Sequence, residues 1–113
     1  MNYRFYYPEW NNRKEVCKEY PPIKEITREP TSFWFGVGPK RTIRKTKKSI
    51  QRLLKRADPY LPILVIYSIP YRDLGHHSKG GAESNREYLE FIRGFCDAIG
   101  DRSPIVIYEP DCI

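Results

Sequence analysis

The 113-residue sequence lacks any apolar run of membrane-spanning length, which excludes a transmembrane helix. Residues 1–8 lack the apolar segment of a signal peptide, so nothing visible directs export. Cysteine is scarce as well, because Cys17, Cys96 and Cys112 are odd in number and form no Cys-x-x-Cys pair. We therefore expect neither a disulfide framework nor a zinc site, but small hydrophobic side chains with at most one bridge.

Metal ligands are sparse too. The adjacent histidines, His76 and His77, have no second ligand pair at helical spacing around them. We expect no metal, and the sequence suggests no other cofactor. Hydrophobic residues nevertheless make up 40% of the chain, which is enough for a packed core and argues against wholesale disorder.

Acidic residues are absent from the segment 30–57, which contains nine lysines and arginines. The whole chain has 20 basic and 14 acidic residues, so its net charge of +6 comes from this one segment. Nine cations at this density could neutralise phosphates, and a nucleic-acid-binding module is one hypothesis. The same cations alternate with an apolar stripe, however, which favours the solvated outer face of a helix. We expect no nucleic-acid partner.

Hydrophobic periodicity predicts alternating strands and helices after a polar start. Residues 1–30 contain four prolines, which favours an extended segment with room for one short helix. Ser84 and Glu87 predict a capping box before the second long helix, and Gly100 predicts its C-cap. The predicted strands span 31–36, 63–69 and 105–108, and the predicted helices span 42–57 and 84–99.

This alternation predicts an α/β fold with right-handed crossovers and a parallel sheet of buried strands. The strand 63–69 is apolar enough to be buried on both faces. The carboxyl ends of parallel strands meet at one edge, where chemistry collects. All three predicted strands end in aromatic or acidic residues, among them Trp34, Tyr67 and Asp111. That pattern favours a site over plain turns.

Two carboxylates, Asp73 and Asp111, follow neighbouring predicted strands. Placed in one cleft, one of them would raise the pKa of the other, which could then serve as a general acid. Alternatively, Asp73 forms a salt bridge with Arg72 or Arg102, and Asp111 caps a turn. The spacing alone leaves both interpretations open.

Motifs along nearly the whole chain are more specific than this pattern. Residues 66–82 read IYSIPYRDLGHHSKGGA, residues 107–111 read IYEPD, and residues 99–102 form an Ile-Gly-Asp-Arg turn between them. Upstream, residues 30–35 read PTSFWF and residues 5–8 read FYYP. In their order along the chain, these segments resemble the motifs of glycoside hydrolase family 6.

The resemblance implies a distorted β/α barrel that hydrolyses cellulose with inversion, as an endo-β-1,4-glucanase or a cellobiohydrolase. It implies that Asp111 is the general acid, that Asp73 supports its proton and positions water, and that Tyr67 favours a distorted sugar ring. Trp34 would stack on a glucosyl unit, as aromatic faces suit the C–H faces of sugars. The implied partner is β-1,4-glucan rather than a membrane, and the implied location is extracellular.

The sequence departs from the family pattern in the loop after Asp73. Leu74 replaces a cysteine that usually forms a disulfide, so that bridge is absent. Ser78 and Lys79 fall in a flexible loop whose serine contacts the sugar and its catalytic water in the family. One alignment places Lys79 at the serine, which would change the charge beside both aspartates.

The length of the chain is the largest departure, because a β/α barrel takes about 250 residues. We expect residues 1–113 to form the N-terminal three β/α units of a partial catalytic domain, with the barrel not closed. The catalytic base and most sugar-binding tryptophans would then lie elsewhere, and the chain alone would be inactive. A non-catalytic carbohydrate-binding remnant is the alternative. The open sheet edge favours self-association.

Overall fold

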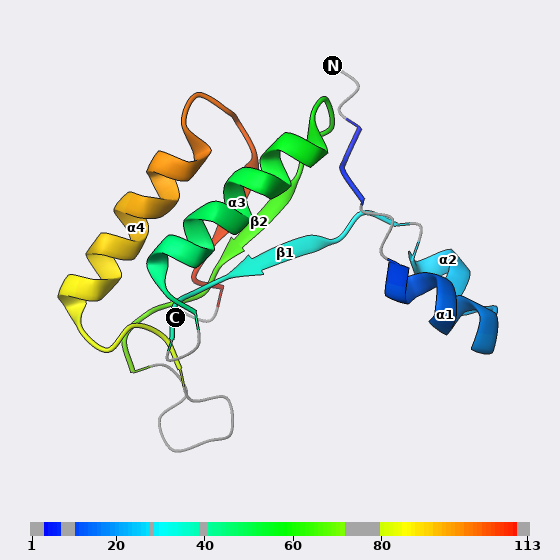
Figure 1. Ribbon diagram of the computed structural model, residues 1–113, viewed down its shortest axis with the longest axis horizontal. Coiled ribbons are helices and arrows are strands. Elements are labelled where there is room, and N and C mark those ends of the chain that lie inside the picture. The colour runs from blue at the N-terminus through cyan, green and yellow to red at the C-terminus, as the bar shows by residue number, and fades with distance from the viewer. Residues whose placement is uncertain (1–3, 8–10, 28, 39–40, 72–79, 111–113) are drawn as a thin grey trace.

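The structure is a computed structural model that describes residues 4–7, 11–27, 29–38, 41–71 and 80–110 (Figure 1). Two short helices precede an alternation of strands and helices. In chain order the elements are α1 (Asn11–Glu19), α2 (Ile23–Thr27), β1 (Ser32–Phe35), α3 (Ile43–Ala57), β2 (Ile63–Ile66), α4 (Asn85–Ile99) and β3 (Ile105–Tyr108).

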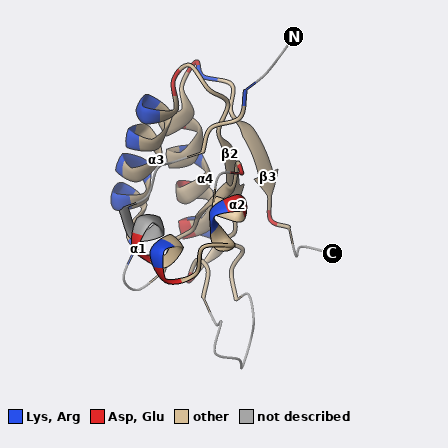
Figure 2. Ribbon diagram, turned by 90° about the vertical axis from the view of Figure 1, so that its right-hand side faces the viewer, with Lys and Arg blue, Asp and Glu red and all other residues tan. Residues whose placement is uncertain are grey.

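The three strands form one parallel sheet in the order β1-β2-β3. Trp34 of β1 is paired with Val65 of β2, which is paired in turn with Ile107 of β3. Both crossover helices, α3 and α4, lie on the same face of the sheet (Figures 1 and 2). The predicted α/β fold with parallel strands is confirmed, and the described strands form an open sheet.

Helix α3 places its apolar and basic side chains on opposite faces. It begins after Thr42, whose hydroxyl accepts a hydrogen bond from the N–H of Lys45 at 3.3 Å. Its lysines and arginines are mostly on the side of the helix that lies away from the sheet (Figure 2). The residues it buries are Thr46, Ile50, Leu54 and Ala57. Most cations of the acid-free segment thus belong to this one helix, as its sequence pattern favours.

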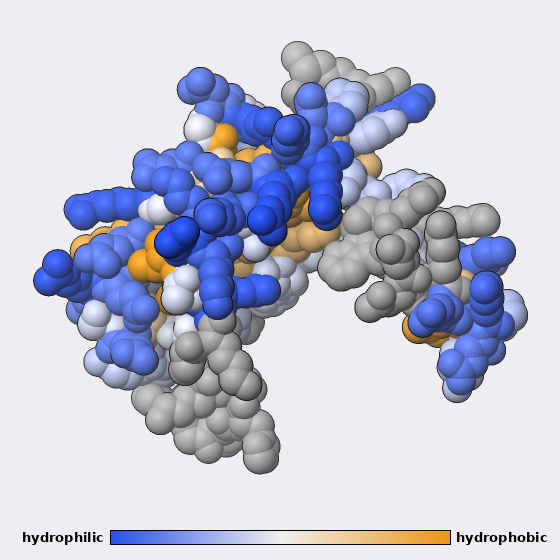
Figure 3. Space-filling view, viewed as in Figure 1, coloured by the Kyte–Doolittle hydropathy of each residue, from blue (hydrophilic) through white to orange (hydrophobic). Residues whose placement is uncertain are grey.

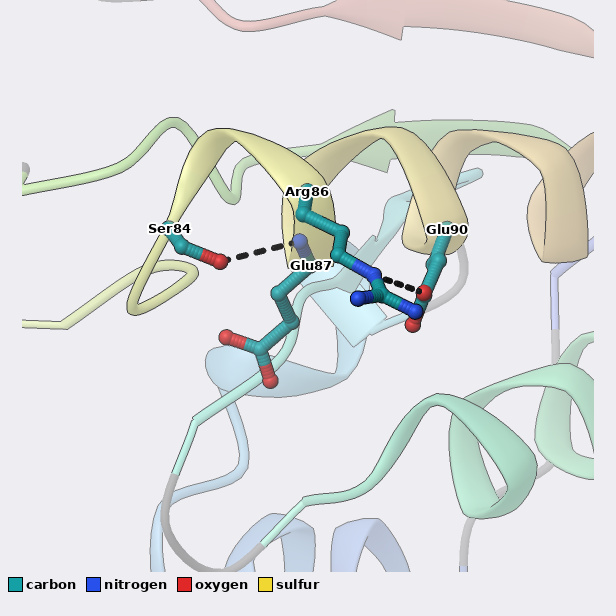
Figure 4. Close-up of polar contacts among 4 residues, drawn as sticks. All are labelled: Ser84, Arg86, Glu87 and Glu90. Carbon is teal, nitrogen blue, oxygen red and sulfur yellow. Dashed lines mark hydrogen bonds and ion pairs between the residues drawn. The ribbon is translucent and has the colours of Figure 1, made fainter.

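Helix α4 has the start and the end that its sequence predicts, with one difference in the cap. The Ser84 hydroxyl accepts a hydrogen bond from the N–H of Glu87 at 3.1 Å (Figure 4). In a capping box the Glu87 carboxylate would accept a hydrogen bond from the N–H of Ser84. Here it accepts the bond from the N–H of Glu83 instead. At the other end, Gly100 has a φ of 57° and donates its N–H to the Cys96 carbonyl.

The core fills the space between the two helices and the sheet. From the sheet it contains Phe35, Leu64 and Ile66, which face α3 and α4. Val65 alternates to the other face of β2 and is buried there as well. The prediction that this strand is buried on both faces is therefore confirmed. The helices contribute Ile50, Leu54, Phe91, Phe95 and Ala98.

Strand β3 does not match the prediction of a buried strand. All four of its residues are exposed, and Ile107 retains 42% of its accessible surface. Within the described residues β3 pairs with β2 alone, and no strand lies on its other side. An edge strand with one neighbour stays accessible whatever its composition, which the sequence pattern does not reveal.

The polar start of the chain contains two helices, where the sequence predicted an extended segment with one short helix at most. Helices α1 and α2 lie away from α3 and α4 (Figure 1). The Sγ of Cys17 lies 3.4 Å from the Oγ1 of Thr27, which connects the two. Cys17 and Cys96 are free, and Cys112 lies outside the described residues. No helix among the described residues is long and apolar enough to span a membrane.

Candidate active site

The carboxyl ends of the three strands meet at one edge of the sheet, as the parallel topology requires. The backbone pairing between β1 and β2 continues one residue beyond the end of β2, since Tyr67 donates its N–H to the carbonyl of Phe35 at 3.0 Å. Beyond Tyr67 the regular pairing stops, although the sequence predicted a strand as far as Ile69. The apolar character continues to Ile69, but the backbone there bonds to other partners.

Trp34 and Tyr67 lie together at this edge. Strand alternation turns both side chains to the face of the sheet opposite the helices, since Phe35 and Ile66 face the core. Their ring centroids are 5.8 Å apart with an interplanar angle of 88°, an edge-to-face contact. Trp34 nonetheless keeps 54% of its surface exposed. The pair is a fixed aromatic surface that remains open to a ligand.

Glu109 supplies the partners that the end of β2 lacks. Its carboxylate accepts the N–H of Ser68 at 2.9 Å and 3.0 Å through its two oxygens. One of these oxygens also accepts the N–H of Ile69 at 3.2 Å. Glu109 itself is only 3% exposed. The buried carboxylate of Glu109, the residue that follows β3, therefore bonds to the backbone just beyond the end of β2.

Ser68 extends these bonds to the rest of the edge. Its buried hydroxyl accepts the N–H of Val37 at 3.0 Å, and its carbonyl accepts the N–H of Ala82 at 3.0 Å. The hydroxyl of Thr46, on α3, donates to the carbonyl of Gly36 at 3.1 Å. The ends of β1 and β2 are thus connected to the segment before α4 and to α3.

Two tyrosines lie beside Glu109. The hydroxyls of Tyr88, on α4, and Tyr108, at the end of β3, are 2.5 Å apart. Burial raises the pKa of Tyr88 far above its ordinary value, and the hydrogen bond with Tyr108 and the negative charge of Glu109 add to the shift. The folded chain therefore favours the neutral form of the Tyr88 hydroxyl.

The structure brings together two of the six residues that the sequence singled out, Trp34 and Tyr67. The other four, Asp73, Ser78, Lys79 and Asp111, lie outside the described residues, as do His76 and His77. The two interpretations of Asp73 and Asp111, a carboxylate pair or two separate structural aspartates, therefore both stay predictions.

Sequence reasoning missed the roles of Glu109 and Ser68. The available signal was weak: a glutamate directly follows an apolar strand, where a turn residue would suffice. Its partners are 40 and 41 positions away along the chain. No local pattern links such distant residues.

A cavity of about 530 Å³ lies elsewhere, at the amino ends of β2 and β3. The N-terminal segment reaches it, since Leu61 donates its N–H to the carbonyl of Arg4 at 2.9 Å. Neither Trp34 nor Tyr67 lines this cavity, so it is separate from the aromatic edge. Among the described residues no three histidine, cysteine or acidic side chains are grouped to hold a metal.

Known proteins are similar to this chain both in sequence and in fold. The model of the family Glycosyl hydrolases family 6 matches residues 9–113. The chain is 37% identical over 95 residues to Endoglucanase 1 of Streptomyces sp. (strain KSM-9), and 32% identical over 91 residues to Endoglucanase A of Cellulomonas fimi. These matches cover 82% and 80% of this chain.

A solved structure supports the fold. The structure of the endoglucanase Cel6 from Mycobacterium tuberculosis, in complex with a methyl-cellobiosyl thio-cellobioside, matches 98% of the chain with a TM-score of 0.80 at 21% identity. The chain spans 39% of that protein, and 26% and 20% of the two bacterial relatives. Because the family match extends over almost the whole sequence, the chain belongs to Glycosyl hydrolases family 6.

Proposed function

We propose that this chain is the amino-terminal part of a family 6 catalytic domain that hydrolyses β-1,4-glucan with inversion. The observation that carries the proposal is the aromatic pair at the carboxyl edge of the sheet, Trp34 against Tyr67, in a chain of this family. The Mycobacterium tuberculosis relative carries a cellobioside ligand in its structure. A half-exposed indole beside a second ring is suited to the apolar faces of glucosyl units.

The proposed chemistry assigns one role to each site residue. Asp111 donates the proton to the leaving glucosidic oxygen, and Asp73 keeps that proton in place by raising the pKa of Asp111. Tyr67 crowds the sugar whose bond is cleaved, and the loop residues Ser78 and Lys79 lie near the attacking water. Inversion needs acid and base about 6.5–9.5 Å apart, with water between them. The base would come from a part of the domain outside these 113 residues.

Two consequences follow for the whole protein. The chain of 113 residues should release no sugar by itself, because it supplies an acid without a base. The complete enzyme would act outside the cell, where its polymeric substrate is found.

The test compares this chain with the product of the reading frame continued beyond Ile113. Release of reducing sugar from carboxymethyl cellulose is expected for the continued protein, with a loss of about 10²–10⁴-fold in Asp111→Asn. Product released as the α-anomer, observed by NMR, would support inversion. Hydrolysis that Asp111→Asn leaves unchanged would refute the assignment of the acid. Sugar release by the 113-residue chain would refute the proposal that it lacks the catalytic base and is inactive by itself.

A second measurement addresses the aromatic pair. Cellohexaose titrated into the continued protein should bind more weakly to the Trp34→Ala variant by at least about tenfold, as expected for the loss of a stacked ring. The matched control is Tyr60→Ala, which removes an exposed aromatic side chain near the cavity at the other end of the sheet. Equal affinities for the two variants would contradict the proposed sugar platform. Binding without any turnover would favour a carbohydrate-binding remnant instead.

A further inference from the structure

The backbone conformation of Glu109 is the starting point. Its φ is 43°, in the left-handed region that favours glycine and strains other residues. It also precedes Pro110, and a residue before proline favours an extended backbone. A glycine would relieve the strain, yet a glutamate occupies the position. The side chain must therefore supply something that the edge needs.

The Glu109 backbone shows where the side chain turns. Its N–H donates to the carbonyl of Ile66 at 2.8 Å, which continues the pairing between β3 and β2 by one residue. The side chain reaches Ser68 and Ile69, so one residue bonds to β2 through its backbone and to the segment just after β2 through its carboxylate.

The backbone partners of the carboxylate are the neutral N–H groups of Ser68 and Ile69, and the Tyr88 hydroxyl lies beside it as well. Ser68 is fully buried, so its N–H would have no water oxygen to donate to if Glu109 were missing. Among the described residues no lysine or arginine forms an ion pair with Glu109. The carboxylate therefore acts as a charged acceptor for backbone amides, a strong type of hydrogen bond.

We propose that Glu109 is a positioning residue whose carboxylate replaces a neighbouring strand beyond the end of β2, and so holds Tyr67 in place against Trp34. Tyr67 lies between Ile66, the last residue of β2, and Ser68, and Glu109 bonds to both of these neighbours. The N–H of Tyr67 bonds to β1, so the segment is held from both sides. The link between Glu109 and sugar binding rests on the proposed function. The hydrogen bonds from the amides of Ser68 and Ile69 to Glu109 do not depend on it.

The first experiment measures amide hydrogen exchange by NMR in the full chain. Glu109→Gln keeps the size of the side chain but replaces one acceptor oxygen with an N–H₂ group. Exchange at Ser68 and Ile69 should accelerate by at least about tenfold, while the β2 amide of Leu64 changes much less. The matched control is Glu90→Gln, an exposed glutamate on α4 that pairs with Arg86. It should leave all these rates unchanged.

Exchange that rises uniformly through the sheet, or not at all, would overturn the proposal. If Glu109→Gln does not fold, Glu109→Asp keeps the charge with a shorter reach, and the same local acceleration is expected. A second test titrates cellohexaose into the continued protein and its Glu109→Gln variant. Weaker binding with a folded core, together with the local exchange, supports both proposals. Local exchange in a protein that never binds cellohexaose upholds the role of Glu109 and refutes the proposed function.

Discussion

Two glycines at the carboxyl edge of the sheet occupy positions where a Cβ atom does not fit. A Cβ at Gly36 would lie 2.6 Å from the carbonyl oxygen of Tyr67, and one at Gly81 would lie 2.1 Å from that of Ile69. Gly81 also has a φ of 90°, which other residues rarely adopt. The segments beside β2 approach its end this closely because both positions lack a side chain.

Gly81→Ala should therefore be strongly destabilising. The expected loss in the free energy of unfolding is about 2–5 kcal/mol, from steric overlap and left-handed strain together. Gly38→Ala is the matched control, because a Cβ there meets nothing within 4 Å, and its effect should stay within about 1 kcal/mol. Urea unfolding followed by circular dichroism measures both. Equal values for the two variants would contradict the close approach.

At the scale of elements, one pair of side chains joins helix α4 to strand β3. The hydroxyls of Tyr88 and Tyr108 are 2.5 Å apart, and the pKa of Tyr88 is raised in the folded chain by burial, by this bond and by the charge of Glu109. A raised pKa means that the folded state keeps a proton that the unfolded state releases above about pH 10. Stability from this pair is thus complete below pH 10 and declines as the pH rises further.

Tyr88→Phe separates this contribution from those of the other tyrosines. Near neutral pH the variant should be less stable than the original chain by about 1 kcal/mol, since it loses a hydrogen bond. Above pH 10 the original chain should lose that advantage by at most about 1.4 kcal/mol per pH unit relative to the variant. Unfolding in urea from pH 8 to pH 11 measures the difference. A constant difference would mean that Tyr88 does not titrate abnormally.

The long helices and strands could be predicted because their sequence signals are local. The apolar stripe that ends at Ala57 and the cap residue Ser84 act within a few positions, and the observed helices begin and end where these signals place them. Helices α1 and α2 were missed because their segment is polar and broken by prolines. Such a sequence gives no apolar stripe to detect.

The details of the site depend on contacts that no local pattern encodes. The side chain of Trp34 could be placed at the edge, since strand alternation and the predicted sheet suffice. The end of β2 was predicted three residues too late, because an apolar run does not show that Glu109 takes over the amide of Ser68. The exposure of β3 likewise depends on which strand lies beside it, and not on the residues of β3 themselves.

At the scale of the whole molecule, the two faces of the sheet differ sharply. The face covered by α3 and α4 is largely hydrophilic on its outer surface (Figure 3). The opposite face carries Trp34 and Ile107, both substantially exposed, on either side of the buried Val65. Apolar surface beside an unpaired strand edge favours pairing with another chain.

We therefore expect the 113-residue chain to self-associate through β3, and Ile107→Lys to weaken that association. A lysine on an edge strand opposes pairing because its charge would lie within the apolar surface that the association buries. Ile26→Lys is the control, since Ile26 is 74% exposed but belongs to α2, away from the sheet. Sedimentation velocity over a range of concentrations measures both variants. A chain that stays monomeric throughout, or equal effects of the two lysines, would exclude β3 as the association site and leave its exposed edge without a role in this chain.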